Sequence, residues 1–328
     1  MRGTQESRRK GSRPGGVDRV LRFGLRGAGM AVLAIMAAVG LFLALRGANA
    51  LRVSGWSFFT TAAWEPDSHN FGIAAVITGT LLIAGVAIAT AVPLATAGAL
   101  YISEYAPRRA RQTLIYLVDL MAAVPSIVYG LWGVTFLQPH VTGLSHWLHT
   151  YLGWIPAFAV DGVDPRDPLT GPTPYTSSTF IAGIVVGLMV TPIACSIMRE
   201  TFSQAPPGER EAAYALGATR WGVIRSVVLP YARGGMIGGT MLGLGRALGE
   251  TIAVYVIISP VFAIQPHLLQ SGTSSVSSLI ALRYGAATPF GISALFAAGL
   301  ALFAMTLVVN FAASTIIARS RSGAMSEA

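Results

Sequence analysis

The sequence predicts an all-α integral membrane protein with six transmembrane helices. The first reason is composition: of 328 residues, 53% are hydrophobic and only 11% are charged, whereas soluble domains carry about 25% charged residues. The second is that apolar residues gather in runs of the roughly 20 residues that cross a hydrocarbon core. The third is that lipid leaves open sheet edges unsatisfied, so these runs are expected to be helices.

The expected spans form one transmembrane domain over residues 24–317. The second span is long for a single crossing, so we expect Pro93 to kink it or its end to run along the membrane interface. The spans cover about 24–45, 72–103, 113–137, 177–199, 234–259 and 290–317.

The distribution of positive charge predicts that both termini lie in the cytoplasm. Eighteen of the 23 lysine and arginine residues lie before residue 27, after residue 317 and in the connections 104–112 and 199–233, and such residues mark the cytoplasmic side. The tail 1–23 is expected to be basic and disordered, and 318–328 forms the second tail. The net charge of +9 therefore indicates orientation in a lipid bilayer, and no nucleic-acid partner is expected.

A cleaved signal peptide is the main alternative for the first span. A basic region precedes the apolar run, and Ala48-Asn49-Ala50 resembles a cleavage site. We favour an uncleaved helix, because the basic region is unusually long and Arg46 interrupts the approach to the alanines.

Cysteine and histidine suggest no redox or metal chemistry. The single cysteine, Cys195, lies in an apolar segment and is expected to be a small buried residue. His140, His146 and His149 contain no pair at i,i+4 spacing, so no metal site is predicted.

The connection 200–233 carries the most specific pattern in the chain. Pro206-Pro207-Gly208 ends the preceding structure, the residues that follow favour a short helix with acids in its first turn, and Gly217 suits a left-handed helix stop. The pattern reads Glu211-Ala212-Ala213, three residues, Gly217, nine residues, then Val227, Val228, Leu229 and Pro230.

This pattern resembles the EAA loop of ABC-importer permeases, with Val227 in place of the usual isoleucine. The resemblance implies that the loop forms a knob that docks on a separate ATPase subunit and couples to its motion. The residues implied in ATPase coupling are Glu211, Ala212, Ala213, Gly217, Leu229 and Pro230.

The chain has no P-loop of its own. That motif needs Gly-Lys-Ser/Thr, and the only lysine, Lys10, follows Arg9. We therefore expect no enzymatic activity and no bound cofactor in this chain, with ATP and magnesium held by a partner subunit.

The fifth span contains two charges, Arg246 near the bilayer centre and Glu250 one turn further on. Such charges are costly in lipid. On a continuous helix they share about 80° of arc with Gly235, Gly239 and Gly243. This face is expected to meet a neighbouring helix or a partner subunit, with Arg246 and Glu250 paired at i,i+4.

Two interpretations of these charges remain open. One is an anion pathway, because arginine stays charged and binds phosphate-like oxygens with two parallel donors. The other is a structural ion pair that locks helix packing.

Four segments carry a closer resemblance: 123–133, 216–221, 229–230 and 243–251. They resemble the phosphate-specific (Pst) importer, and the Gly-Leu-Gly-Arg sequence at 243–246 resembles its C-type permease subunit more than the A-type. The resemblance covers roughly residues 72–315 and implies a type I ABC-importer permease bundle in the bacterial plasma membrane. It also implies roles for Arg246 and Glu250 in transport.

The family further implies an assembly with a homologous A-type permease, two ATPase subunits and an extracytoplasmic phosphate-binding protein. Two alternatives remain: a permease for another oxyanion such as molybdate or sulfate, and a membrane sensor or scaffold for phosphate without transport. A sensor does not need charges at mid-membrane, so Arg246 and Glu250 disfavour it.

Asp119, near the start of the third span, is a third candidate for the substrate pathway. It is expected either to pair with Arg246 across the bundle or to lie near the cytoplasmic headgroups.

Overall fold

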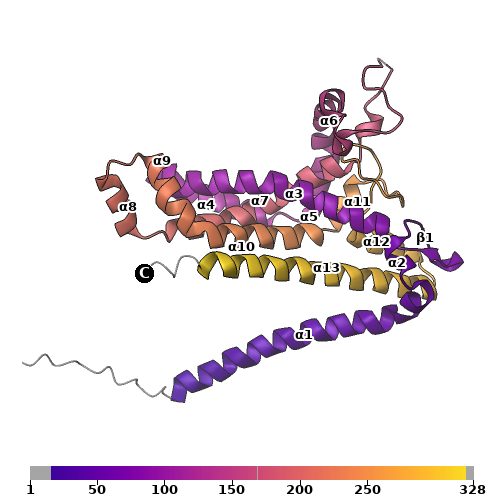
Figure 1. Cartoon of the computed structure of the whole chain (residues 1–328), viewed down its shortest axis with the longest axis horizontal. Coiled ribbons are helices and arrows are strands. Elements are labelled where there is room, and N and C mark those ends of the chain that lie inside the picture. Colours follow the sequence, from indigo (N-terminus) through magenta and orange to yellow (C-terminus); the bar gives the residue numbers. More distant parts are fainter. Residues whose placement is uncertain (1–15, 168, 323–328) are drawn as a thin grey trace, which may run out of the picture.

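The computed structural model describes residues 16–167 and 169–322, and within them nearly all regular structure is helical (Figure 1). The long helices are α1 (Gly16–Ser54), α3 (Ala74–Leu100), α4 (Arg108–Ala123), α6 (Gln138–Leu152), α7 (Thr179–Ser203), α10 (Leu229–Leu248) and α13 (Pro289–Ser322). The short ones are α2 (Ser57–Thr60), α5 (Ser126–Trp132), α8 (Pro207–Ala215), α9 (Arg220–Val223), α11 (Ile252–Ile257) and α12 (Val276–Arg283). The strands β1 (Trp64–Glu65) and β2 (Asn70–Phe71) form a small antiparallel hairpin.

Four helical segments of the described chain are long and apolar enough to cross a membrane: Val20–Ser54, Ala74–Tyr105, Thr179–Ser203 and Pro289–Ala312. They match the first, second, fourth and sixth expected spans. A fifth crossing is possible if α4 and the helical run Ser126–Leu152, which meet at a bend of 90°, count as one broken span. The expected count of six therefore stays a prediction.

The third expected span, 113–137, is not the single straight helix that the sequence predicted. α4 ends at Ala123, and the chain is extended at Val124 and Pro125 before α5 begins. The residue before a proline avoids the helical region, and the proline supplies no backbone N–H, so helix is broken at this dipeptide. The Tyr129 hydroxyl donates to the Met121 carbonyl oxygen at 3.0 Å and bridges the break.

The fifth expected span, 234–259, is also broken. α10 ends at Leu248, and α11 begins only at Ile252. Before α10, a five-residue π-helical segment, Ile224–Val228, leads directly to Pro230 at the helix start. A proline removes one helical hydrogen bond and crowds the preceding turn, and a π-type turn accommodates this locally.

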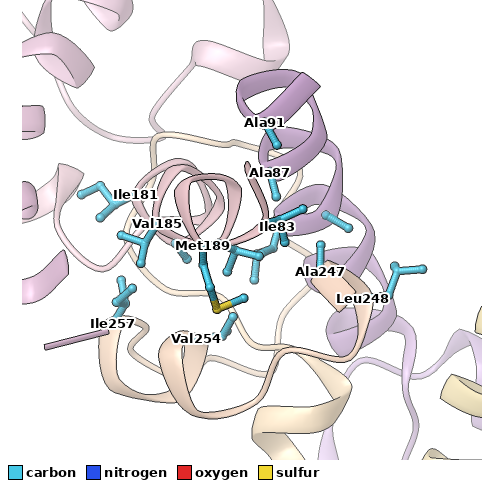
Figure 2. Close-up of a cluster of buried hydrophobic side chains, with 14 of the residues drawn as sticks. Ile83, Ala87, Ala91, Ile181, Val185, Met189, Ala247, Leu248, Val254 and Ile257 are labelled. Carbon is cyan, nitrogen blue, oxygen red and sulfur yellow. The ribbon is translucent and has the colours of Figure 1, made fainter. Parts of the chain in front are cut away.

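The core lies where α3 packs against α7 and against the broken span. Figure 2 shows side chains of α3, α7, the end of α10 and α11 converging in one apolar cluster. The two long helices approach closely at small residues: a Cβ on Gly183 would lie 2.5 Å from the Cβ of Val86. This close packing makes α3 and α7 the rigid centre of the molecule.

Between α11 and α13 the chain folds back into the molecule. The Val276 N–H donates to the Thr80 hydroxyl of α3 at 3.0 Å. A Cβ on Gly79 would lie 2.1 Å from the Ser274 carbonyl oxygen. α12 begins there, with a capping box between Ser275 and Ser278. The first turn of α12 is therefore held against α3 at Thr80, more than one turn after the start of α3.

The two ends of the molecule are distinct. In Figure 1, α8, α9, the start of α1 and the end of α13 lie at one end, which we call the knob end. The β-hairpin, α2 and α6 lie towards the opposite end. There His149 bonds to the Tyr175 hydroxyl at 2.8 Å, and His146 bonds to the Pro165 carbonyl oxygen, also at 2.8 Å.

Part of each expected tail is helical. Residues 16–23, predicted to be disordered, form the start of α1, and α13 continues through 318–322. The rest of both tails, 1–15 and 323–328, lies outside the described residues. The cleavage-like residues Ala48–Ala50 lie inside α1, where the Ala50 N–H donates to the Ser293 hydroxyl.

Candidate transport site and coupling region

The break between α10 and α11 determines where Glu250 lies. Gly249 caps α10, and the chain turns at Glu250 and Thr251 before α11. The Glu250 carboxylate accepts a hydrogen bond from the Ala253 N–H at 3.1 Å, and its carbonyl oxygen accepts one from the Ser277 hydroxyl at 2.7 Å. Glu250 is 9% exposed, so this carboxylate is a buried cap at the start of α11.

Arg246, on the last turn of α10, is exposed and faces a cavity of about 600 Å³, which we call the Arg246 cavity. Among the described residues, no acidic side chain forms an ion pair with it. The cavity is lined by Ile193, Met241, Leu242, Gly245, Arg246, Thr306 and Asn310.

The expected Arg246–Glu250 pair is therefore corrected. It assumed one continuous helix through both residues, and α10 ends between them. With the helix interrupted, i,i+4 spacing no longer aligns the two side chains, and the Glu250 carboxylate is directed to the Ala253 N–H instead.

The glycine face of α10 meets a neighbouring helix, as predicted, and that helix is α7. A Cβ on Gly235 would lie 2.1 Å from the Thr201 hydroxyl oxygen, and one on Gly243 would lie 2.6 Å from Val190. Arg246 is not buried in this seam with α7, because its side chain is exposed at the cavity; its contact with a partner subunit, the other expected position, stays a prediction.

Asp119 is exposed on α4, and its carboxylate accepts a hydrogen bond from the Ser196 hydroxyl of α7 at 3.1 Å. Of the two positions expected for it, pairing with Arg246 is not found in the described part of the chain. It links α4 to α7 in this structure.

The helix-stop-helix predicted for residues 200–233 is confirmed. α8 ends at Ala215, and Gly217 adopts the left-handed conformation with φ of +82°. The N–H of Ala218 donates to the Ala213 carbonyl oxygen and that of Gly217 to Tyr214, at 3.1 and 2.9 Å. These two bonds form a complete Schellman motif. The Thr219 side chain then caps α9 by accepting from the Gly222 N–H.

We call α8, the Gly217 turn and α9 the knob. Glu211 and Ala212 are exposed, and Ala213 is partly so. Leu216 is 90% exposed, so nearly all of this apolar side chain is free to contact another protein. Leu229 and Pro230 do not belong to this exposed tip: they begin α10, where Leu229 packs on a buried cluster.

Sequence reasoning missed a pair of charges beneath the knob. Arg210 of α8 forms an ion pair with Glu104 at 3.0 Å, and a second guanidinium nitrogen donates to the Phe202 carbonyl oxygen at 2.6 Å. Glu104 belongs to η2 (Tyr101–Tyr105), the π-helical end of the second span. The sequence does show Glu104 as a single acid at the end of an apolar run, which indicates a buried partner. It does not show that the partner is Arg210, 106 residues away.

Comparison with known proteins identifies a family. Residues 91–322 match the family described as "Binding-protein-dependent transport system inner membrane component". The chain is 37% identical over 305 residues to the phosphate transport system permease protein PstC 2 of Mycobacterium tuberculosis, covering 91% of each chain. It is 38% identical over 289 residues to PstC of Xylella fastidiosa, covering 88% of this chain and 86% of the relative.

Among solved structures, the chain resembles a bacterial ABC transporter involved in the import of the acidic polysaccharide alginate. The TM-score is 0.56 and the identity 18%, covering 91% of this chain and 98% of that chain. This likeness concerns the fold alone. With a family match over most of its length and relatives above one-third identity, the chain belongs to the binding-protein-dependent transport system inner membrane components, and among them to the PstC-type phosphate transport system permeases.

Proposed function

We propose that this chain is the C-type permease subunit of an ATP-driven importer of inorganic phosphate and that Arg246 is its substrate-binding cation. The PstC relatives support the substrate class, because they align over about nine-tenths of the chain. The observation that carries the role of Arg246 is its placement: an exposed guanidinium in a cavity, without an acidic partner among the described residues.

The chemistry of the Arg246 cavity suits an oxyanion. A guanidinium presents a planar fork of donors that stays charged at every physiological pH. Asn310 adds an amide with both donor and acceptor groups, and the Thr306 oxygen, whose hydrogen is directed to the Phe303 carbonyl oxygen, offers an acceptor. Phosphate carries both charged and protonated oxygens near neutral pH, so a mixed set of donors and acceptors complements it.

The knob supports coupling to a separate ATPase. It projects beyond the long helices in Figure 1, and its tip exposes the apolar side chains of Tyr214 and Leu216. Exposed apolar groups beside charged ones are typical of a protein–protein contact. We propose docking of ATPase subunits there, with ATP and magnesium bound by them.

The proposed assembly contains a homologous A-type permease, two such ATPases and an extracytoplasmic phosphate-binding protein. The chain then lies in the bacterial plasma membrane with both termini and the knob in the cytoplasm. The knob, the start of α1 and the end of α13 lie at one end of the fold, which supports this orientation, as does the arginine distribution.

Other oxyanions remain the nearest alternative substrates, since the charge of Arg246 alone attracts sulfate and molybdate equally. A sensor or scaffold without transport is disfavoured, because an unpaired arginine within a membrane segment is costly unless it serves a pathway.

Reconstitution tests this proposal. Proteoliposomes containing the complete complex, with ATP enclosed on the knob side and binding protein outside, should accumulate labelled phosphate. A tenfold excess of unlabelled sulfate or molybdate should leave uptake unchanged, and unlabelled phosphate should suppress it. Accumulation of sulfate or molybdate in place of phosphate would refute the proposed substrate.

A further inference from the structure

The ion pair between Arg210 and Glu104 joins the knob to the transmembrane core. Arg210 lies on α8, and Glu104 lies on η2, which directly continues α3. The Glu104 side chain is 9% exposed and that of Arg210 is 23% exposed. We propose that this pair is a positioning device that carries movement of the knob into α3 and from there to the break at Glu250. This inference rests on the proposed coupling role of the knob.

The knob does not need this pair for its own fold. Its turn is closed by the Schellman bonds at Gly217 and its second helix by the Thr219 cap. Arg210 instead reaches outside the knob to two other elements, the Glu104 carboxylate of η2 and the Phe202 carbonyl oxygen at the end of α7. Arg220 makes a second contact to η2, with its guanidinium 5.1 Å from the centre of the Tyr105 ring.

The pair is only half engaged in this structure. A guanidinium and a carboxylate can form two parallel hydrogen bonds, but here Nη1 and Oε2 form one, at 3.0 Å. The Glu104 Oε1 and Arg210 Nε atoms are buried and have no hydrogen-bond partner within the described part of the chain. Both unused atoms belong to the same ion pair, so in the proposed movement α8 shifts relative to η2 until a second hydrogen bond forms while both charges stay together.

α3 is the element that extends from this pair to the opposite end. From Glu104 to Thr80 the helix spans about 36 Å, at about 1.5 Å per residue. Thr80 accepts from the Val276 N–H at the start of α12, and Ser277 of the same turn donates to the Glu250 carbonyl oxygen. These two hydrogen bonds therefore connect α3 to the turn at Gly249–Thr251, which directly follows the last turn of α10 that carries Arg246. Packed rigid elements of this kind can carry coupling between sites.

The test uses the complete complex and two readouts. Glu104→Gln removes the charge and keeps the shape of the side chain. We expect full assembly and ATP hydrolysis within twofold of wild type, with phosphate taken up per ATP reduced at least tenfold. The double reversal Glu104→Arg with Arg210→Glu should restore uptake per ATP to within threefold of wild type. Glu200→Gln, an exposed acid at the end of α7, is the matched control and should behave as wild type.

The second readout requires no substrate. In a Cys195→Ser background, spin labels at Asp161 and Ala286, both exposed, report the distance between the loop that follows α6 and the segment that follows α12. ATP should change this distance in wild type and in Glu200→Gln, and leave it unchanged in Glu104→Gln. If wild type shows the change but transports no phosphate, the substrate assignment fails while this inference stands.

Three results would overturn the inference. The first is normal uptake per ATP in Glu104→Gln. The second is a loss of ATP hydrolysis and uptake in the same proportion as a loss of assembled complex, since that indicates a purely structural anchor. The third is a spin-label distance that behaves alike in the two proteins, either unchanged by ATP in both wild type and Glu104→Gln or changed by ATP in both.

Discussion

The two charged side chains at the end of α10 have separate environments although they are four residues apart in sequence. Arg246 faces a cavity, where water and anions can reach it. The Glu250 carboxylate is buried and bound to the Ala253 N–H. One of these residues is therefore available to a ligand, and the other is occupied in holding the start of α11.

Arg246→Gln should abolish phosphate uptake while the complex still assembles, because the cavity loses its only arginine. Arg246→Lys should retain part of the activity, since it keeps the charge but loses the planar fork. The measurements are uptake by proteoliposomes and the subunit ratio of the purified complex. Robust uptake by Arg246→Gln at normal assembly would refute the role of Arg246.

Glu250 should respond to substitution as a helix cap. Glu250→Gln keeps an oxygen that accepts from the Ala253 N–H, so its thermal stability should stay close to wild type. Glu250→Ala leaves that buried N–H unpaired and should cost about 1–2 kcal/mol. Thermal unfolding of the purified complex distinguishes them.

The double variant Arg246→Gln with Glu250→Gln tests whether the two side chains interact. Because the structure contains no ion pair between these residues, the stability changes of the single variants should add. A coupling energy of more than about 1 kcal/mol between the two substitutions would show that Arg246 and Glu250 interact, and would support a structural ion pair.

At the scale of elements, interruptions of helix determine the form of this molecule. Val124-Pro125 bends the third span by 90°, and the turn at Gly249–Thr251 ends α10 and starts α11. Gly217 makes a third interruption and separates α8 from α9. The last two interruptions place side chains where a continuous helix would not: Glu250 at a cap, and Leu216 at an exposed tip.

Gly217→Pro should weaken ATPase association without affecting membrane insertion. Proline cannot adopt the positive φ of this residue, and it removes the N–H that bonds to Tyr214. The measurement is the amount of ATPase that copurifies with the chain from membranes. We expect a loss of several-fold.

Gly208→Ala is the control for the knob. Position 208 lies in the first turn of α8, its φ is not positive, and an added Cβ would meet nothing within 4 Å. Its ATPase content should equal that of wild type. If Gly217→Pro also copurifies with full ATPase content and transports normally, the coupling role of the knob is wrong.

At the scale of the whole molecule, the long helices α3, α10 and α13 run side by side, α6 leaves this direction after the bend of 90°, and the two ends of the molecule differ (Figure 1). The knob end carries α8, α9 and the described ends of α1 and α13, and α6 lies towards the opposite end (Figure 1). α1 diverges from α13 towards its own start, and its apolar window is not covered by the other residues that the structure describes. Lipid or another subunit therefore surrounds it in the membrane.

Single cysteines in a Cys195→Ser background should report this orientation. Arg108→Cys lies at the start of α4, on the side predicted to be cytoplasmic, and should be protected from an impermeant maleimide in intact cells. Asp164→Cys, in the exposed segment after α6, should be labelled. Labelling of position 108 from outside would overturn the proposed topology.

The sequence by itself determined the membrane class, the family pattern of the knob and its stop at Gly217, because these depend on composition and on contacts within a few residues. It also identified the glycine face of α10, which follows from helical periodicity. Only the tertiary structure decided that the third and fifth spans are broken, that Arg246 and Glu250 do not pair, and that Arg210 meets Glu104. The physical reason is that a hydropathy window averages over the local break at Gly249–Thr251, while the Arg210–Glu104 contact depends on packing between segments 106 residues apart.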